Sequence, residues 1–318
     1  RYKKKLLDVP IFNNSIAALV DKCLQLQEPE TYKDQLIAKP LKICISHDID
    51  AVDGNDFWSQ SARIFRFLNP IIKAKIPKFN QLWFILINYL RPKKFYSDSV
   101  EGMITIERLF GYRSICYLLN GKRGRFEARS KFSSVSNFAK KIPTGWLLGM
   151  HYNYNTHLKE EPFIFQKIAL ENIKEGISNF GRAHYLRLDP KLSLIFWDKM
   201  GIKVDESIGY SNEIGYRAGI GGVFKSFNKD LQNEIDIICL PLIVMDQNLN
   251  FDNEDHLLKY IEDLVSHLSI VGGIFTLLFH PEQFDNPEFP KLRKTYIKIL
   301  GIFYRYDAKS ILPNEIKF

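Results

Sequence analysis

The stretch "LKICISHDIDAVDG", Leu41–Gly54, decides the fold because it places a polar cluster directly after an apolar run. Leu41, Ile43 and Ile45 recur at every second position, which is the period of a β-strand. The "SHDID" that follows, Ser46–Asp50, therefore lies at the end of a predicted strand, at the rim of a sheet. We expect a functional site to begin there.

The composition predicts a globular protein with one large core. The chain has 318 residues, of which 46% are hydrophobic. Its longest candidate for a membrane span, Leu82–Leu90, is far shorter than the roughly 18 apolar residues that a span needs, and we recognise no signal peptide. The four cysteines have no CxxC spacing, so we expect reduced core residues, a reducing compartment and a cytoplasmic protein.

The net charge of +8 is modest for a nucleic-acid-binding protein, so we expect no nucleic-acid partner. Two basic stretches, Arg1–Lys5 and Gly121–Lys131, are predicted to be a solvated terminus and a solvated loop. Contact of these stretches with an acidic glycan, a phosphate or an anionic lipid is the alternative.

From Leu41 onward, apolar runs of strand length alternate with amphipathic helical stretches, which predicts an α/β fold with a parallel sheet. About seven such units suit a closed or nearly closed barrel with helices outside. The predicted strands are Leu41–Ser46, Arg113–Leu119, Trp146–His151, His184–Leu188, Ile202–Asp205, Ile235–Met245 and Ile274–His280. The predicted helices are Val100–Phe110, Phe163–Phe180, Lys191–Met200 and His256–Leu268.

Two regions lie outside this alternation. Residues 1–40 are predicted to be a helical lead-in to a barrel domain at 41–318. A helical insertion is predicted at about 57–95, as two apolar, basic helices broken by Pro70 and Pro77. Packing over the pocket is the first interpretation of this insertion. The alternative is an interfacial helix at 57–90, which would bring the protein into peripheral contact with the inner membrane.

Polar side chains follow nearly every predicted strand. In a barrel of parallel strands the active site gathers at the carboxyl ends of the strands, so these side chains are predicted to form one site. The segments are "SHDID" (46–50), "HYNYNTH" (151–157), "RAHYLRLD" (182–189), "DESIGYSNEIGYRAG" (205–219) and "HPEQF" (280–284), and they hold five of the seven histidines: His47, His151, His157, His184 and His280.

Asp48 and Asp50 can divide two tasks, one binding a divalent cation and the other serving as a base beside a metal-activated water. A turn or helix-capping pair is the alternative. His151 supplies a second possible ligand from another strand end, and an imidazole with a carboxylate suits zinc or a similar ion. Asn155 is either a weak ligand or a helix cap, and His157 is predicted to be a surface or supporting residue.

His280, at the end of "FTLLFH", is placed to act as a general acid toward a leaving group, with a structural histidine as the alternative. Arg182, Arg187 and Arg217 are predicted to surround the same rim. Their guanidinium groups can orient the catalytic aspartate or bind substrate oxygens. One of the three is alternatively an ordinary ion-pair partner.

Taken in order, these segments resemble the polysaccharide deacetylase family, carbohydrate esterase family 4 with its NodB-homology fold, in its divergent branch found with bacterial surface-polysaccharide genes. The resemblance runs from about Leu41 to Asp285 and implies a distorted (β/α) barrel and metal-assisted removal of an N-acetyl group from an amino sugar. The pieces that carry it are "SHDIDAV", "VEGMITIERLFGYRSICYLL", "LLGMHYNYNTH", "RAHYLRLD", "DESIGYSNEIGYRAG", "LPLIVMD" and "LLFHPEQF".

The resemblance also implies roles. Asp48 matches the base, Asp50 the metal-binding aspartate and His151 the first metal histidine, while His280 lies in the LxH motif of the general acid. Arg182 matches the arginine that holds the base, with Arg187 as a competing assignment. By resemblance, Asp205 matches a further acidic motif near the site, and His184 replaces the proline of an RxPY motif. The full set predicted to bind substrate or support the site is His157, His184, Tyr185, Arg187, Asp205 and Arg217.

The sequence departs from the family where the second metal histidine is expected, because that residue is Asn155. Either Asn155 coordinates, His157 reaches in, or the site no longer holds metal; we expect a weakened but real site for zinc, or for cobalt or nickel.

The predicted substrate is an amino sugar or glycan, lipid- or nucleotide-linked, in capsule or lipopolysaccharide synthesis. The alternatives are a catalytically inactive, deacetylase-like glycan-binding or scaffold protein, and a hydrolase that opens a cyclic amide.

Overall fold

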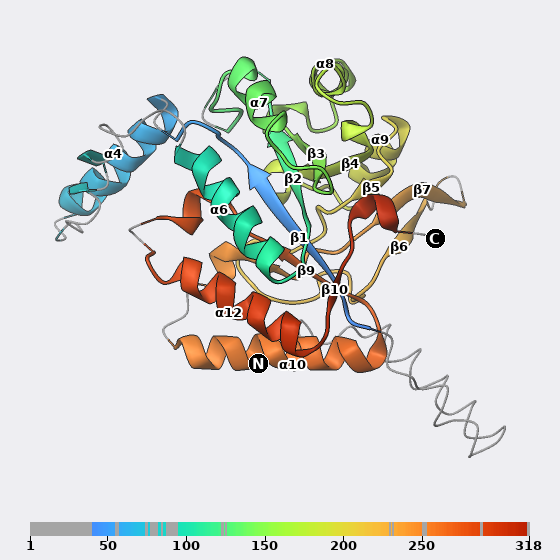
Figure 1. Ribbon diagram of the computed structural model, residues 1–318. Coiled ribbons are helices and arrows are strands. Elements are labelled where there is room, and N and C mark those ends of the chain that lie inside the picture. The colour runs from blue at the N-terminus through green and yellow to red at the C-terminus, as the bar shows by residue number, and fades with distance from the viewer. Residues whose placement is uncertain are drawn as a thin grey trace.

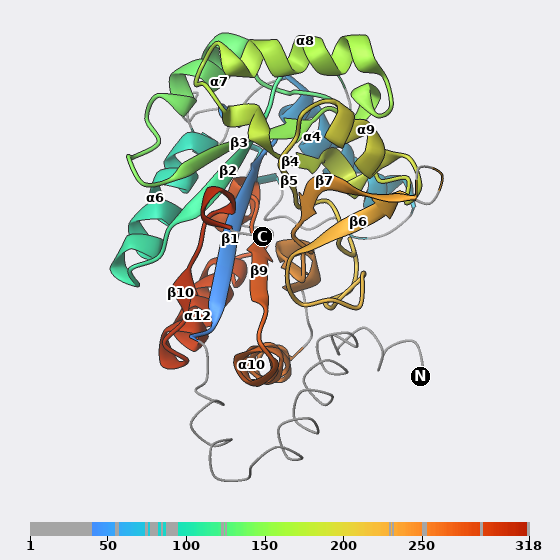
Figure 2. The same cartoon turned by 90° about the vertical axis from the view of Figure 1, so that its right-hand side faces the viewer.

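The computed structural model shows a curved, mainly parallel β-sheet with helices packed around its outside (Figures 1 and 2). The α/β class predicted from the alternation of strands and helices is confirmed. The structure describes residues 40–54, 57–73, 76, 82–83, 85–86, 95–121, 124, 126–228, 230, 232–249, 253–286 and 289–316. The predicted lead-in at 1–40 lies, except for its last residue, outside this described part.

The strands follow the order β6-β7-β5-β4-β3-β2-β1-β9-β8, with β10 also pairing with β1. Every pair is parallel except β6 with β7. Among the described strands, β6 and β8 are the ends of this path. The strands are β1 (Lys42–Ile49), β2 (Ser114–Leu119), β3 (Leu147–Tyr152), β4 (Phe180–Ala183), β5 (Val204–Asp205), β6 (Phe224–Asn228), β7 (Asn233–Cys239), β8 (Val244–Met245), β9 (Ile274–Leu278) and β10 (Lys309–Ser310).

Helices cover the outer face of the sheet in two groups with separate apolar cores. α10 and α12 pack against β1 and β9, α7 and α8 pack against β2 and β3, and α9 packs against β7, while α6 contributes side chains to both cores. The helices are α4 (Phe57–Ile72), α6 (Phe95–Leu109), α7 (Phe132–Ala139), α8 (Glu160–Glu171), α9 (Ser193–Lys199), α10 (Glu254–Val271), α11 (Pro281–Phe284) and α12 (Leu292–Arg305).

The two faces of β1 have different chemistry, because successive side chains of a strand point to opposite sides. Ile43 and Ile45 enter the outer core under α10 and α12. On the other face, Ser46 and Asp48 bond to Arg182 of β4, although β2 and β3 separate these two strands in the sheet. The sheet is therefore curled around a polar interior.

Three predicted elements were wrong in detail. The predicted strand at His184–Leu188 begins instead as a 3-10 turn at His184–Leu186, because Tyr185 has a left-handed backbone (φ 59°) that cannot continue a strand. The preceding residues form β4, and the helix predicted to run to Phe180 ends at Glu171. Gly181, which directly follows that predicted helix, lies inside β4, where Tyr152 leaves no room for a side chain.

The predicted strand Ile235–Met245 is two strands, β7 and β8, with different neighbours. Pro241 lies between them and cannot donate a ladder hydrogen bond, which is a physical reason for the break. In the insertion, α4 continues through Pro70 to Ile72, so the break predicted at Pro70 was wrong. No described helix is long and apolar enough to span a membrane. Of the four cysteines, three are buried and free, and Cys23 lies outside the described residues.

A buried carboxylate fastens the outer core to the sheet. Glu107 of α6 accepts hydrogen bonds from Tyr296 (2.7 Å), Ser114 (2.6 Å) and Trp146 (3.1 Å), and its Oε1 lies 2.7 Å from Nε2 of His47. Burial raises the pKa of Glu107, but the charge of His47 and these hydrogen bonds outweigh it, so the pKa is lowered. The ionised carboxylate is therefore the form that the fold favours.

We predict that Glu107→Gln lowers the free energy of unfolding at pH 7 by about 3 kcal/mol, because it removes one member of a buried ionic network. A carboxyl group whose folded pKa is lowered stabilises the protein above its unfolded pKa, and this contribution is lost as the pH falls through the folded pKa. The difference from wild type should therefore shrink toward pH 4, as measured by urea unfolding.

Glu262→Gln is the matched control, because Glu262 forms an exposed ion pair with Arg305 and should lose less than about 1 kcal/mol. Equal losses in the two variants would contradict the prediction.

Candidate metal centre and catalytic site

Three strands of the sheet, β1, β3 and β4, bring the predicted site residues to one edge. Asp48 and Asp50 lie at the carboxyl end of β1, His151 lies near the end of β3, and His184 directly follows β4. All four side chains are buried. The convergence predicted from the strand ends is therefore present in the structure.

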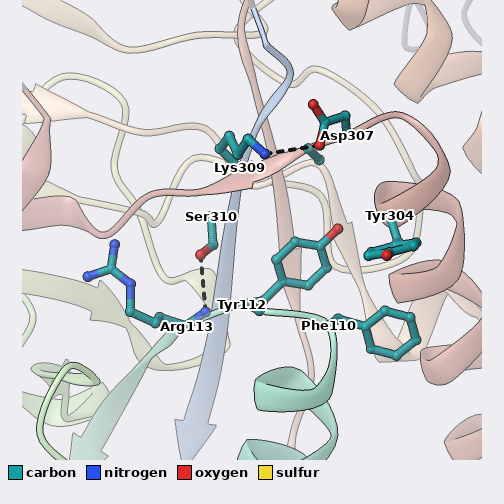
Figure 3. Close-up of a pocket in the computed structure, with 9 residues that line it drawn as sticks. Phe110, Tyr112, Arg113, Tyr304, Asp307, Lys309 and Ser310 are labelled. Carbon is teal, nitrogen blue, oxygen red and sulfur yellow. Dashed lines mark hydrogen bonds and ion pairs between the residues drawn. The ribbon is translucent and has the colours of Figure 1, made fainter.

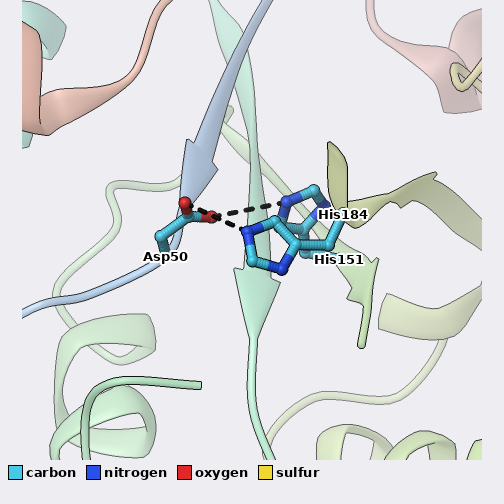
Figure 4. A group of neighbouring side chains, drawn as sticks. All are labelled: Asp50, His151 and His184. Atoms are coloured by element: carbon cyan, nitrogen blue, oxygen red, sulfur yellow. Dashed lines mark hydrogen bonds and ion pairs between the residues drawn. The ribbon is translucent and has the colours of Figure 1, made fainter. Parts of the chain in front are cut away.

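Asp50, His151 and His184 form a group that could hold a metal ion (Figure 4). One ligand atom from each residue lies within 4.8 Å of the others. Nε2 of His151 is 3.4 Å from Oδ1 of Asp50, and Nε2 of His184 is 3.3 Å from Oδ2. One carboxylate and two imidazoles are a ligand set suited to zinc and similar divalent ions.

Hydrogen bonds at Nδ1 fix the ring orientation of both histidines. Nδ1 of His151 is 2.9 Å from the carbonyl oxygen of Arg182, and Nδ1 of His184 is 3.1 Å from that of Phe126. A carbonyl can only accept, so each Nδ1 carries a proton, and each Nε2, once deprotonated, can offer a lone pair to a cation held beside Asp50. Oδ1 of Asp50 and Nε2 of His151 are buried without a hydrogen-bond partner. A cation between these atoms would satisfy both, so the residues fit a metal.

Asp50 is suited to remain ionised. Burial raises its pKa, but the nearby His184 and His151 outweigh burial and hold the pKa well below its usual range. A carboxylate must be deprotonated to bind a metal, so this environment favours the binding form.

Arg182 holds Asp48 from the interior of the sheet. Its Nη1 donates to Oδ1 of Asp48 (2.7 Å), and its Nη2 donates to Ser46 Oγ (2.8 Å) and to the carboxylate of Glu206. Its guanidinium also lies 4.7 Å from the ring centroid of Tyr117. Burial raises the pKa of Asp48, but Arg182 and two histidines outweigh it, so the pKa is lowered and the carboxylate is ionised at neutral pH. Of the two arginines considered for this role, Arg182 is the one that contacts Asp48.

His280 faces the same carboxylate from β9. Its Nε2 is 4.0 Å from Oδ2 of Asp48, while its Nδ1 lies 3.0 Å from both oxygens of Asp246. The backbone N–H of His280 also donates to Asp246 (2.6 Å). Burial lowers the pKa of His280, but Asp246 and the other nearby carboxylates outweigh it and raise the pKa. The imidazolium form is therefore favoured at neutral pH.

Comparison with solved structures identifies the fold. No protein-family model matches the sequence, and no curated protein matches it. A candidate polysaccharide deacetylase from Mycobacterium smegmatis is 11% identical, with a TM-score of 0.52 and an alignment that covers 86% of this chain and 87% of that one. The chain has the fold of a polysaccharide deacetylase. The resemblance inferred from the sequence is thus confirmed at the level of fold.

Two further structures were found at lower TM-scores, which add nothing to this deacetylase fold assignment. A candidate polysaccharide deacetylase involved in O-antigen biosynthesis from Bordetella bronchiseptica has a TM-score of 0.41 and 13% identity, and the alignment covers 83% of each chain. A family 4 carbohydrate esterase from Streptomyces lividans, in complex with acetate, has a TM-score of 0.39 and 11% identity, covering 67% of this chain and 85% of that one.

Within this deacetylase fold, Asn155 lies in the turn after β3 and is exposed, and its backbone N–H donates to Glu127 (2.8 Å). Its assignment as a ligand stays a prediction. Nε2 of His157 is 2.8 Å from Ser193 Oγ, so this histidine supports the neighbouring loop. Burial, together with nearby Arg187, lowers its pKa.

Three more predicted residues support the loops around the site. Asp205 receives two hydrogen bonds from Ser207 (2.9 Å each), and Ser207 in turn accepts the N–H of Ala183 (2.8 Å), next to His184. Burial raises the pKa of Asp205 to about 7. Arg187 donates to the carbonyl oxygen of Tyr154 (2.6 Å), and Arg217 donates to that of Gly209 (2.9 Å).

Sequence reasoning missed Glu206, Asp246, Glu127, Arg129 and Glu282. The first two lie in segments that carried the resemblance, so their position after a strand was an available signal. Arg129 and Glu127 come from the basic stretch expected to be a solvated loop. Glu127 is buried, and Arg129 forms an ion pair (3.4 Å) with Glu282 beside the site. For these two residues the prediction of a solvated loop was wrong.

A separate pocket of about 310 Å³ lies between α12 and the start of β2 (Figure 3). It is lined by Tyr112, Arg113 and Ser310, and Ser310 pairs with Ile43 near the start of β1. The strands are parallel, so this pocket is at the opposite end of β1 from Asp48 and is not the site described above.

We predict that zinc stabilises the wild-type protein and that His184→Ala weakens zinc affinity at least about 100-fold, because one of two imidazole ligands is lost. Isothermal titration and the zinc-dependent shift in Tm measure this affinity. His157→Ala is the matched control and should retain it.

Asn155→Ala separates the two ligand assignments. If Asn155→Ala loses zinc affinity while His184→Ala keeps the zinc affinity of wild type, His184 is not the ligand.

Proposed function

We propose that this protein is a metal-dependent hydrolase that removes an N-acetyl group from an amino sugar during synthesis of a bacterial surface polysaccharide. One observation carries the proposal: Oδ2 of Asp48 lies 3.5 Å from Nε2 of His151 and 4.0 Å from Nε2 of His280. A carboxylate thus stands between a candidate metal group and a protonated imidazole. This is the arrangement that hydrolysis of an amide with a poor leaving group needs.

A divalent cation at Asp50, His151 and His184 would supply positive charge that polarises the acetyl carbonyl and acidifies a water molecule. Asp48, kept ionised by Arg182, takes a proton from the attacking water while the water oxygen bonds to the carbonyl carbon. His280 gives its proton to the nitrogen as the C–N bond breaks. The products are acetate and a free amino sugar, and Asp246 orients the imidazole throughout.

Aromatic side chains beside the metal group suit a sugar ring. Tyr185 is 54% exposed, and its ring lies 4.3 Å from that of His184 and 5.9 Å from those of Phe126 and Tyr154. Its left-handed backbone is costly for a tyrosine, and such strain concentrates at functional sites. We assign this aromatic surface to the substrate glycan.

The ligand set favours zinc, with cobalt or nickel as substitutes. The carrier of the sugar, a lipid or a nucleotide, and the product, capsule or lipopolysaccharide, are parts of the proposal that rest on the resemblance alone. A cytoplasmic location is likewise part of the proposal.

A catalytically inactive glycan-binding protein is the second candidate, because Asn155 stands where the resemblance places a metal histidine. His184 weakens this argument, since it provides a second imidazole at the metal group.

We predict that Asp48→Asn reduces acetate release from N-acetylglucosamine oligomers or UDP-N-acetylglucosamine by about 10²–10⁴-fold, because the base is lost. Zinc affinity should be nearly unchanged, which separates loss of the base from loss of the metal. Asp263→Asn, an exposed change on α10, is the control. If the zinc-loaded wild type releases no acetate from N-acetylated or lipid-linked N-acetylated sugars and opens no cyclic amide, the inactive protein is favoured.

A second prediction concerns Asp246, which we assign as a positioning residue. In Asp246→Asn the carboxylate that raises the pKa of His280 is gone, so the imidazolium loses its proton at lower pH. The alkaline limb of the kcat/KM profile, where the acid is lost as pH rises through its pKa, should move to lower pH. A profile that keeps its shape while activity falls uniformly would contradict this role.

A further inference from the structure

Helix α4 exposes its apolar side chains. Phe65 is 63% exposed and Ile72 is 76% exposed, which is unusual for large apolar residues in a folded protein. The spacing of these residues along α4 places them on one stripe of the helix. The stripe, which we call the α4 face, consists of Phe57, Ile64, Phe65, Leu68, Ile71 and Ile72.

The orientation of α4 is the reverse of that of an ordinary surface helix. Among the α4 side chains whose burial the structure describes, Arg63 is the buried one, with a hydrogen bond to the carbonyl oxygen of Gly54 (2.6 Å) and another to the hydroxyl of Tyr96. A surface helix normally turns its apolar stripe inward. Here the protein holds the helix by an arginine and leaves the α4 face on its outside.

The charge of the surrounding segment is equally one-sided. Residues 57–97 contain eight lysines and arginines and no aspartate or glutamate. The whole chain has 44 basic and 36 acidic residues, so the rest has 36 of each and no net charge. The entire excess of +8 therefore belongs to the segment that carries the α4 face. Four further large apolar residues of the segment are also exposed: Ile76, Leu82, Trp83 and Leu86.

We propose that this segment docks the protein on the surface of a bilayer that contains anionic lipids. A helix with an apolar stripe on one side and Arg66 and Lys73 on the other can lie in the interface, with the stripe among the acyl chains and the cations near the phosphates. Figure 1 shows α4 projecting at the edge of the molecule, clear of α10 and α12.

The charge selects this occupant over others. A second copy of this chain would bring the same net positive segment to the interface, including the exposed Arg66 and Lys73, and like charges would repel it. A nucleic acid would be attracted to the cations but would leave the apolar stripe in water. An anionic bilayer satisfies both features together.

The docking surface adjoins the catalytic site. α4 begins seven residues after Asp50, and Arg63 fastens it to the loop that contains Gly54. A docked α4 would therefore keep the metal group near the bilayer, where a lipid-linked glycan would be found. This last step rests on the proposed function, whereas the docking itself does not.

Vesicle flotation of the full chain tests the proposal without metal or substrate, so that its failure is separate from failure of the deacetylase assignment. Wild type should float with phosphatidylcholine vesicles containing 30% phosphatidylglycerol, and less with phosphatidylcholine alone or in 0.5 M salt. The variant Phe65→Gln/Leu68→Gln/Ile72→Gln should bind at least about tenfold more weakly. Arg66→Gln/Lys73→Gln should lose part of the preference for anionic vesicles.

Matched controls remove the same groups elsewhere. Leu109→Gln/Phe227→Gln/Ile270→Gln removes three exposed apolar residues outside the segment, and Lys174→Gln/Lys203→Gln removes two exposed charges. Both should float like wild type. The proposal would be overturned if a control variant lost as much vesicle binding as the variant it matches, or if wild type did not float. A wild-type dimer in sedimentation velocity that the triple variant converts to monomer would also overturn it, since a second copy would then occupy the α4 face.

Discussion

The site depends on one buried guanidinium. Arg182 bonds to Asp48 and Glu206; its charge helps to hold the pKa of Asp48 down against burial, and it offsets part of the burial that raises the pKa of Glu206. The same side chain links β4 to Ser46 on β1, across two intervening strands, so it also holds the curvature of the sheet. Replacing it would leave a buried charge unpaired and would release the two strand ends that carry the proposed base and a candidate metal histidine.

Local pattern was sufficient to predict which strand ends meet. Asp48, Asp50, His151 and His280 were all assigned from their positions after apolar runs, and the structure brings them to one edge because parallel strands end on the same side. His184 was assigned only a supporting place. Its place in the candidate metal group depends on the turn at Tyr185, and hydrophobic periodicity cannot predict the left-handed backbone of that residue.

The periodicity of the sequence also could not predict which way the apolar stripe of α4 faces. The sequence predicted an amphipathic insertion, but the same pattern fits a helix with its apolar stripe inward or outward. The contact between Arg63 and the Gly54 loop decides between them, and it joins residues on different elements. Asp246 and Glu206 were missed for a related reason. Each lies in a segment that was singled out, yet only the three-dimensional arrangement shows that its side chain meets His280 or Arg182.

The backbone of Arg182 adds a constraint that its side chain alone would not. Its guanidinium bonds to Asp48, while its carbonyl oxygen accepts the Nδ1 proton of His151 and so turns Nε2 toward Asp50. A single residue therefore positions both the proposed base and a candidate metal ligand. Because β4 is short and is followed at once by His184, a shift of this strand would move the base, the first histidine and the second histidine together. The metal group and the base are mechanically coupled, so changes in β4 should alter metal affinity and proton transfer jointly.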